Sequence, residues 1–250
     1  MKKMSLLLLL CLSLVLMLGS VVIAAEYVAV SGGKVVIDGN LSDWQTGGKF
    51  IVPAIVCNDK AQAVRGDTAW TDANDSSGLI YLRWTNDYLL LAADVTDDVG
   101  TLASRPDNGD SIGIDITIGK NATVLIEMTP YPPNGDWNQA VLARDAGPMT
   151  TYSANIYVRA IAKADGKGYY LEAALPWSEL KVGDVSFNPL NSIPVTMFNV
   201  IVTDSDDGVA RKSVLLNTRS ASNPVTSWYR LLTQLIPIVF SGDGVGEVTW

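Results

Sequence analysis

Residues 36–44 read VIDGNLSDW and carry the clearest signal of the fold. The β-branched pair Val36 and Ile37 suits an extended strand, and the Asp-Gly-Asn that follows has the residue types of a tight turn. Trp44 then places a large apolar ring close behind the turn. The stretch predicts a β-strand that ends in a turn at the start of a folded body.

The same pattern of strand and turn recurs along the chain. In residues 112–118 four isoleucines alternate with Gly, Asp and Thr, which gives one apolar and one more polar face. Similar alternation fills residues 156–162, 169–175 and 195–202, and Asn-, Asp- and Gly-rich segments separate such runs. The sequence therefore predicts an all-β fold, an antiparallel β-sandwich of the jelly-roll or immunoglobulin-like kind, in a single domain.

The N-terminal segment has the features of a signal peptide. Lys2 and Lys3 precede an apolar run over residues 6–18, and small residues follow up to Ala25. We expect residues 1–25 to be removed and residues 26–250 to form a secreted or otherwise extracytoplasmic protein in the periplasm or at the cell surface. The alternative is that the apolar run is retained as a membrane anchor.

Composition excludes several classes of function. The net charge of −8 disfavours nucleic acid as a partner, because phosphate backbones are themselves negative. The absence of histidine excludes histidine-based acid–base catalysis and the usual zinc sites. Cys57 is the single cysteine outside the predicted signal peptide, so we expect no intrachain disulfide.

Five blocks of the chain together resemble family 9 carbohydrate-binding modules, which are DOMON-like β-sandwiches. They are IDGNLSDW (37–44), WTNDYLLLAADVTDD (84–98), GDSI (109–112), GYYLEAALPWSEL (168–180), and FNV (198–200) followed by Asp204, Asp206 and Asp207. The blocks occur in the order of the family. The chain departs from the family in three respects. Gly113 stands where the family usually has an acid, residues 106–108 stand where an aromatic often precedes GDSI, and residues 223–250 do not follow the usual closing pattern.

The resemblance implies a non-catalytic protein that binds polysaccharides or sugar chain ends of the xylan or cellulose class. It also implies structural calcium and a glycoside hydrolase, such as a xylanase, as a partner in polysaccharide catabolism. Glu127, Glu172 and Glu179 are candidate glutamates for a glycosidase pair, but Glu172 and Glu179 lie in a family-like block. We expect no intrinsic catalysis.

Aromatic rings on loops are the candidate sugar-binding groups, because sugars stack their C–H faces on flat rings. Trp70 and Trp137 lie in polar loops, so we predict that they stack on the ligand, with Asn138 and Gln139 reading its hydroxyl groups. Trp228 is a further candidate. The alternative for each ring is that it folds back onto its own loop or contacts another subunit. Three other tryptophans lie in the family-like blocks and are expected in the core: Trp44, Trp84 and Trp177.

Acidic residues gather near the ends of predicted strands. Calcium takes six to eight oxygen ligands from such loops, and clustered carboxylates repel one another without a cation. The candidate ligands are Asp94, Asp97, Asp98, Asp107, Asp110, Asp204 and Asp206. The alternative is that these residues form ordinary solvated turns.

Two other functions remain open at the level of the sequence. The first is a calcium-stabilised structural or surface-assembly protein without sugar binding, which Gly113, the apolar residues 231–240 and an unpaired terminal strand over 245–250 would favour through self-assembly. The second is a haem-binding DOMON-like protein. Without histidine its axial ligands would have to be methionine or lysine, for example Met128, Met149 or Met197.

Overall fold

The computed structural model describes residues 27–65, 69–101, 106–118, 122–144, 150–151, 155–182, 185–186, 195–209, 213–216 and 236–250. Its strands are β1 (Tyr27–Ser31), β2 (Lys34–Val36), β3 (Gln45–Thr46), β4 (Lys49–Phe50), β5 (Ile55–Cys57), β6 (Ala63–Arg65), β7 (Ser76–Trp84), β8 (Tyr88–Asp97), β9 (Ser111–Ile118), β10 (Ala122–Met128), β11 (Val141–Arg144), β12 (Thr150–Thr151), β13 (Tyr157–Ala162), β14 (Tyr169–Pro176), β15 (Lys181–Val182), β16 (Val185–Ser186), β17 (Val195–Asp204), β18 (Ser213–Leu216), β19 (Ile236–Ser241) and β20 (Glu247–Thr249).

Short 3₁₀ turns join some of the strands, and the described residues contain no α-helix. They are η1 (Leu41–Trp44), η2 (Lys60–Gln62), η3 (Pro106–Asn108), η4 (Pro133–Gly135) and η5 (Trp137–Gln139). Within these residues, nothing helical has the length and apolar character needed to cross a membrane.

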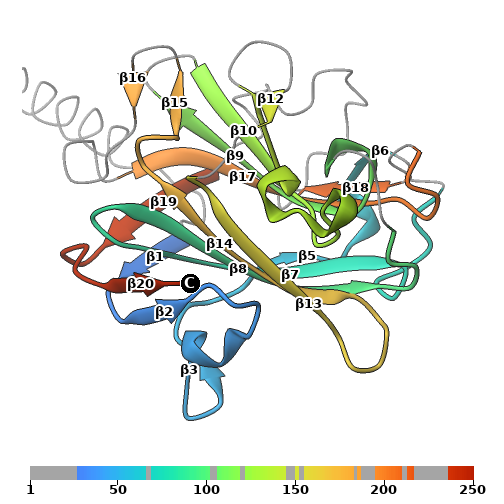
Figure 1. Cartoon of the computed structure of the whole chain (residues 1–250), viewed down its shortest axis with the longest axis horizontal. Coiled ribbons are helices and arrows are strands. Elements are labelled where there is room, and N and C mark those ends of the chain that lie inside the picture. The colour runs from blue at the N-terminus through green and yellow to red at the C-terminus, as the bar shows by residue number, and fades with distance from the viewer. Residues whose placement is uncertain are drawn as a thin grey trace, which may run out of the picture.

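The large sheet folds over into two facing layers (Figure 1). Its strand order is β12-β11-β10-β9-β17-β19-β1-β7-β8-β14-β13, so β19 and β1 connect the layer of β9, β10 and β17 to that of β7, β8 and β14. The all-β sandwich predicted from the sequence is therefore confirmed. Most neighbouring strands are antiparallel, but β1 pairs in parallel with both β19 and β7.

The main core lies between the two layers. Ile112, Ile114 and Ile116 of β9 are all buried in it, as the alternation predicted. The indoles expected in the core are also buried: Trp84 donates to the Ser241 carbonyl at 3.0 Å, and Trp177 to the Thr85 carbonyl at 2.8 Å. Each buried ring therefore keeps a partner for its N–H group, which avoids the cost of an unpaired donor.

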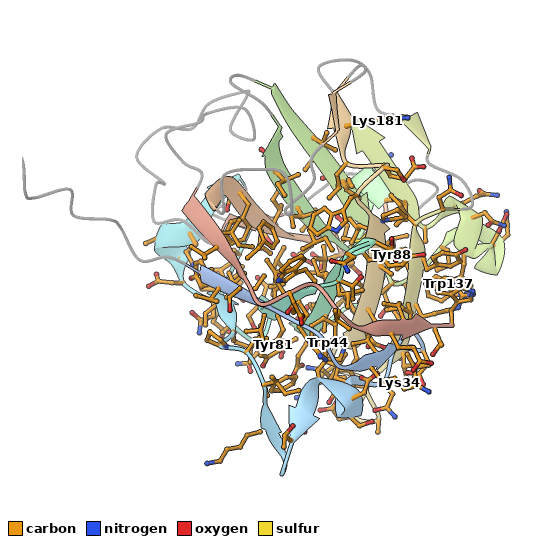
Figure 2. All side chains as sticks on the ribbon, turned by 90° about the vertical axis from the view of Figure 1, so that its left-hand side faces the viewer. Lys34, Trp44, Tyr81, Tyr88, Trp137 and Lys181 are labelled. Atoms are coloured by element: carbon orange, nitrogen blue, oxygen red, sulfur yellow. The ribbon has the colours of Figure 1, made fainter. Side chains whose placement is uncertain are left out.

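Residues 35–52 form a smaller, second core on the outer face of β7, β8 and β14. Apolar side chains of this segment, among them Ile37, Leu41 and Trp44, pack on Tyr81 and Leu90. The motif that resembles the opening of the family therefore packs over the outer face of the sheet, and residues 35–52 are called the cover below. Figure 2 shows Trp44 within the molecule, whereas Trp137 lies near its margin.

Glu172 of β14 fixes this cover to the sheet. Its Oε1 accepts from the Trp44 indole at 2.6 Å, and its Oε2 accepts from the backbone N–H groups of Gly39 at 2.7 Å and Asp38 at 3.1 Å. The carboxyl group is fully buried. Desolvation raises the pKa of Glu172 to about 7, although the three hydrogen bonds act in the opposite direction. The turn and the tryptophan thus converge on one carboxyl group, a structural role that leaves it no access to a substrate.

The C-terminal strand is paired within the chain. β20 forms a parallel ladder with β2, in which Val35 faces Val248. The expectation of an unpaired terminal strand that could add to a neighbour's sheet is therefore wrong for this strand. Met128, a candidate haem ligand, is a buried core residue opposite Ile112 on β9. Met149 lies outside the described residues, as does the side chain of Met197.

Candidate functional site

The loop that carries Trp137 is held together by the side chain of Asp136. This carboxylate caps η5 by accepting from the backbone N–H of Asn138 at 3.0 Å, and it also accepts from the side-chain amides of Asn138 at 3.0 Å and Gln139 at 3.1 Å. The Asn138 backbone N–H, followed by the amide of Gln139, lowers the pKa of Asp136. The loop therefore has a defined shape without burial of its polar residues.

Trp137 lines a surface pocket of about 360 Å³, which is called the Trp137 pocket below. The other lining residues come from the same loop and from the edge strand β13: Gly135, Asp136, Asn138, Ile156, Tyr157 and Arg159. The Trp137 ring is half-buried, and Asn138 and Gln139 are exposed. The structure therefore places the predicted pair Trp137 and Asn138 in one pocket, whereas Gln139 lies in the same loop outside its lining.

The aromatic surface extends beyond Trp137. The Arg159 guanidinium lies 5.2 Å from the centre of the Trp137 ring, and Tyr157 stacks on Trp250 with ring centres 3.8 Å apart and planes at 9°. Tyr157, Arg159 and Trp250 were not predicted as site residues. Flat rings beside a planar guanidinium and an amide form a surface suited to the apolar faces and hydroxyl groups of a sugar.

Trp70 is not an exposed ring. It belongs to the main core with 7% of its surface accessible, and its indole N–H donates to the Ser76 carbonyl at 2.7 Å. The expectation that Trp70 lies open on a loop is therefore wrong. The surrounding polar residues form turns instead of a solvated rim: the carboxylate of Asp75 accepts from the Thr71 N–H at 2.6 Å, which folds the loop back. Trp228 lies outside the described residues.

Three buried carboxylates meet at one end of the sandwich, and they are called the acidic cluster below. Asp97 ends β8, Asp110 precedes β9, and Asp204 ends β17. Each offers an oxygen within 4.8 Å of the others. The β17–β9 ladder brings two of them together, because Thr203 pairs with Ser111. The structure thus unites three aspartates that the sequence predicted as metal ligands from three separate segments.

A second set of carboxylates lies at the rim of this end. Asp75, Asp98 and Asp206 also offer oxygens within 4.8 Å of one another, and two of them are exposed. Asp98 and Asp206 were predicted, whereas Asp75 was missed. The hairpin of β7 and β8 brings Asp75 there, since the Asp98 N–H donates to the Asp75 carbonyl at 3.3 Å.

Asp94 does not belong to either set. It lies three residues before Asp97 on the same strand, so their side chains point to opposite faces of the sheet. Its carboxylate pairs with the Lys163 ammonium at 2.6 Å. The interpretation of Asp94 as a metal ligand beside Asp97 is therefore wrong. The side chain of Asp107 lies outside the part of the chain that is described.

Burial and mutual repulsion raise the pKa values of the acidic cluster. Desolvation, and then the charge of Asp97, raises the pKa of Asp110 to about 9. Desolvation also raises the pKa of Asp204 to about 7 and shifts that of Asp97 in the same direction. Within the described residues, no Lys or Arg forms an ion pair with these three groups.

Two buried oxygens, of Asp204 and Tyr169, have no hydrogen-bond partner among the described residues. They are Asp204 Oδ1 and the hydroxyl of Tyr169, which is fully buried. Desolvation, and then the charges of Asp110 and Asp97, raise the pKa of Tyr169. Carboxylate oxygens with no counter-charge and open lone pairs fit a hard cation such as Ca²⁺.

Comparison with known proteins gives a consistent result for the fold. The family model described as "Carbohydrate family 9 binding domain-like" matches residues 57–228. Two similar solved structures are those of a family 9 carbohydrate binding module from Caldicellulosiruptor kristjanssonii. The complex with cellotriose has a TM-score of 0.57 and 16% identity over 88% of this chain and 95% of that one. The complex with glucose has a TM-score of 0.57 and 18% identity over 88% and 97%. No curated protein matches the chain.

Proposed function

Since the chain belongs to the carbohydrate family 9 binding domain-like family, we propose that it is a secreted, non-catalytic protein that binds polysaccharide. Its ligand is a xylan- or cellulose-class polymer or a chain end of one, and it acts in support of polysaccharide catabolism, alone or beside a glycoside hydrolase. The solved relatives from C. kristjanssonii hold cellotriose and glucose, which supports a ligand of this chemistry.

The observation that carries the proposal is the half-buried Trp137 ring in a pocket of about 360 Å³ with planar polar neighbours. A sugar ring stacks its C–H face on the indole, while Asn138 and Arg159 bond its hydroxyl groups. Asp136 holds the loop in place, so little conformational freedom is lost on binding. Tyr157 and Trp250 extend the aromatic surface for a further unit of the polymer.

Retention on insoluble cellulose and xylan tests the role of Trp137. We expect Trp137→Ala and Trp137→Leu to weaken binding about tenfold or more, and Trp137→Phe to retain most of it, because a flat ring and not apolar character alone is needed. Val209→Ala is a control, since that side chain is 74% exposed and lies outside the pocket. Wild-type retention of Trp137→Ala would show that the sugar binds elsewhere.

We also propose that the acidic cluster binds a structural Ca²⁺. Asp97, Asp110 and Asp204 would hold the ion, which supplies the positive charge that the buried carboxylates lack. These residues belong to the ends of β8 and β17 and the start of β9, so their ligation ties the two layers of the sandwich together. The role is stability and not catalysis.

A further inference from the structure

A second pocket opens on the outer face of the sheet, and it is called the hairpin pocket below. It lies between the segment of η1, β3 and β4 on one side and strands β8 and β14 on the other, and its volume is about 260 Å³. Its lining residues are Asn40, Leu41, Ser42, Gln45, Phe50, Asp94 and Tyr170. None of them lines the Trp137 pocket.

Aromatic rings form two sides of the hairpin pocket. Phe50 is stacked on Tyr81, with ring centres 3.8 Å apart and planes at 8°, which fixes its orientation. A turn at Gly47 and Gly48, both with positive φ, closes the hairpin that carries Phe50. Tyr170 comes from β14 and is half-buried. Both rings are therefore rigidly supported and reach the pocket.

The polar groups of the hairpin pocket add no net charge. Asp94 is neutralised by Lys163 at 2.6 Å, and the same ammonium lies 5.4 Å from the centre of the Tyr170 ring. Asn40 uses its Oδ1 to accept from the Ser42 N–H at 3.2 Å, which leaves its amide N–H₂ group for a ligand. With the amide of Gln45, the pocket offers donors and acceptors suited to a neutral, hydroxyl-rich molecule.

The hairpin pocket and the Trp137 pocket lie on the same face of the sheet, near its edge strand β13. On β13, Tyr157 and Arg159 line the Trp137 pocket, and Ile161 two residues further on faces Tyr170 of β14. Side chains opposite one another in a ladder share a face, and the four steps along the strand from Tyr157 to Ile161 span about 13 Å. That separation requires more than one sugar unit, so one polymer chain can occupy both pockets.

We propose that the hairpin pocket is a second saccharide subsite, so that one polymer chain is bound at two places along the β13–β14 edge. This inference rests on the proposed function, because it takes the ligand class of the Trp137 pocket and extends it. The ring of a second sugar unit lies against Tyr170 and Phe50, and its hydroxyl groups bond Asn40, Gln45 and the carboxylate of Asp94. Two weak pockets on one chain then bind a polymer with avidity that a short oligosaccharide cannot reach.

Calorimetric titration with cellotriose and xylotriose, together with retention on the insoluble polymers, tests the inference. The variants are Tyr170→Ala and Gln45→Ala, with Tyr170→Phe as the matched control that keeps the ring. Gln45 is on the hairpin and outside both cores, so its variant tests the pocket without a packing change. Thermal unfolding confirms that each variant is folded.

We expect two binding events for the wild type and one for each of Trp137→Ala and Tyr170→Ala, whereas Tyr170→Phe keeps both. Loss of either pocket should lower affinity for the polymer about 100-fold, and the trisaccharide affinity of the other pocket should change little. One binding event in the wild type that Trp137→Ala abolishes would overturn the second subsite and leave the proposed function intact. Loss of binding in Tyr170→Ala but not in Trp137→Ala would support the hairpin pocket and refute the Trp137 site.

Discussion

Replacement of Glu172 by glutamine tests whether burial or hydrogen bonding controls this carboxyl group. Burial raises its pKa from 4.5 to about 7. Between these two pH values the native protein holds a proton that the unfolded chain has released, so stability falls as pH rises through that window. The change amounts to about 3 kcal/mol, because each pKa unit is worth about 1.4 kcal/mol. The Glu172→Gln variant lacks this loss of stability with rising pH, because glutamine cannot titrate.

The expected result is a gap in unfolding free energy that closes with pH. At pH 4.5 the variant should be less stable by about 2 kcal/mol, because the amide N–H₂ of glutamine faces the donors of Trp44 or of the Asp38–Gly39 backbone. By pH 8 the wild type has lost about 3 kcal/mol, so the two stabilities should meet or cross.

Urea unfolding followed by tryptophan fluorescence, at pH values from 4.5 to 8 and fixed calcium, measures the gap. The acidic cluster titrates in both proteins, so its contribution cancels in the difference. Glu179→Gln is the matched control, because that half-exposed carboxylate accepts from the amide of Asn155 at 2.8 Å at the surface. A gap that stays constant, or widens as pH rises, would show that the three hydrogen bonds outweigh desolvation.

Three further predictions follow from backbone conformation, the core and the acidic cluster. Gly168→Ala should lower the unfolding free energy in urea by about 2–4 kcal/mol, because φ is +96° there and a Cβ would overlap a carbonyl of β8. Trp70→Phe should cost about 1–3 kcal/mol by leaving a buried carbonyl unpaired, and should leave retention on cellulose unchanged. Ca²⁺ at 100 times its Kd should stabilise the wild type by about 2.7 kcal/mol over the chelated protein in thermal unfolding. The pair Asp110→Asn with Asp204→Asn should lose this shift and Asp94→Asn should keep it, and a shift retained by the pair would place calcium elsewhere.

Local alternation was sufficient to predict the sandwich. Ile112, Ile114 and Ile116 are buried on one face of β9, and alternation with a period of two over this length is typical of a β-strand. The contact between Glu172 and Trp44 could not be predicted from the residues, because they are 128 positions apart and the alternation specifies no partner. Nor does alternation show that β20 pairs in parallel with β2, since pairing direction depends on where the connecting chain runs.

The candidate ligand sites were predictable where strand geometry constrains them. The opposite faces of Asp94 and Asp97 follow from their odd spacing once β8 is known to continue as far as Asp97. Asp75 could have been found from the hairpin register, in which Ser76 faces Asp97. The proximity of Asp97 and Asp204 could not be predicted from the sequence, because the two residues come from different layers of the sandwich.

The two loop tryptophans show why polarity alone does not predict exposure. Trp70 and Trp137 both lie among Asp, Asn and Thr or Gln, and composition cannot separate them. Asp75 turns its loop inward by binding the Thr71 N–H, whereas Asp136 caps η5 and leaves Trp137 at the surface. The difference therefore lies in which backbone donors each carboxylate reaches, and the local hydrogen-bond pattern accompanies packing in the core for Trp70 and a surface position for Trp137.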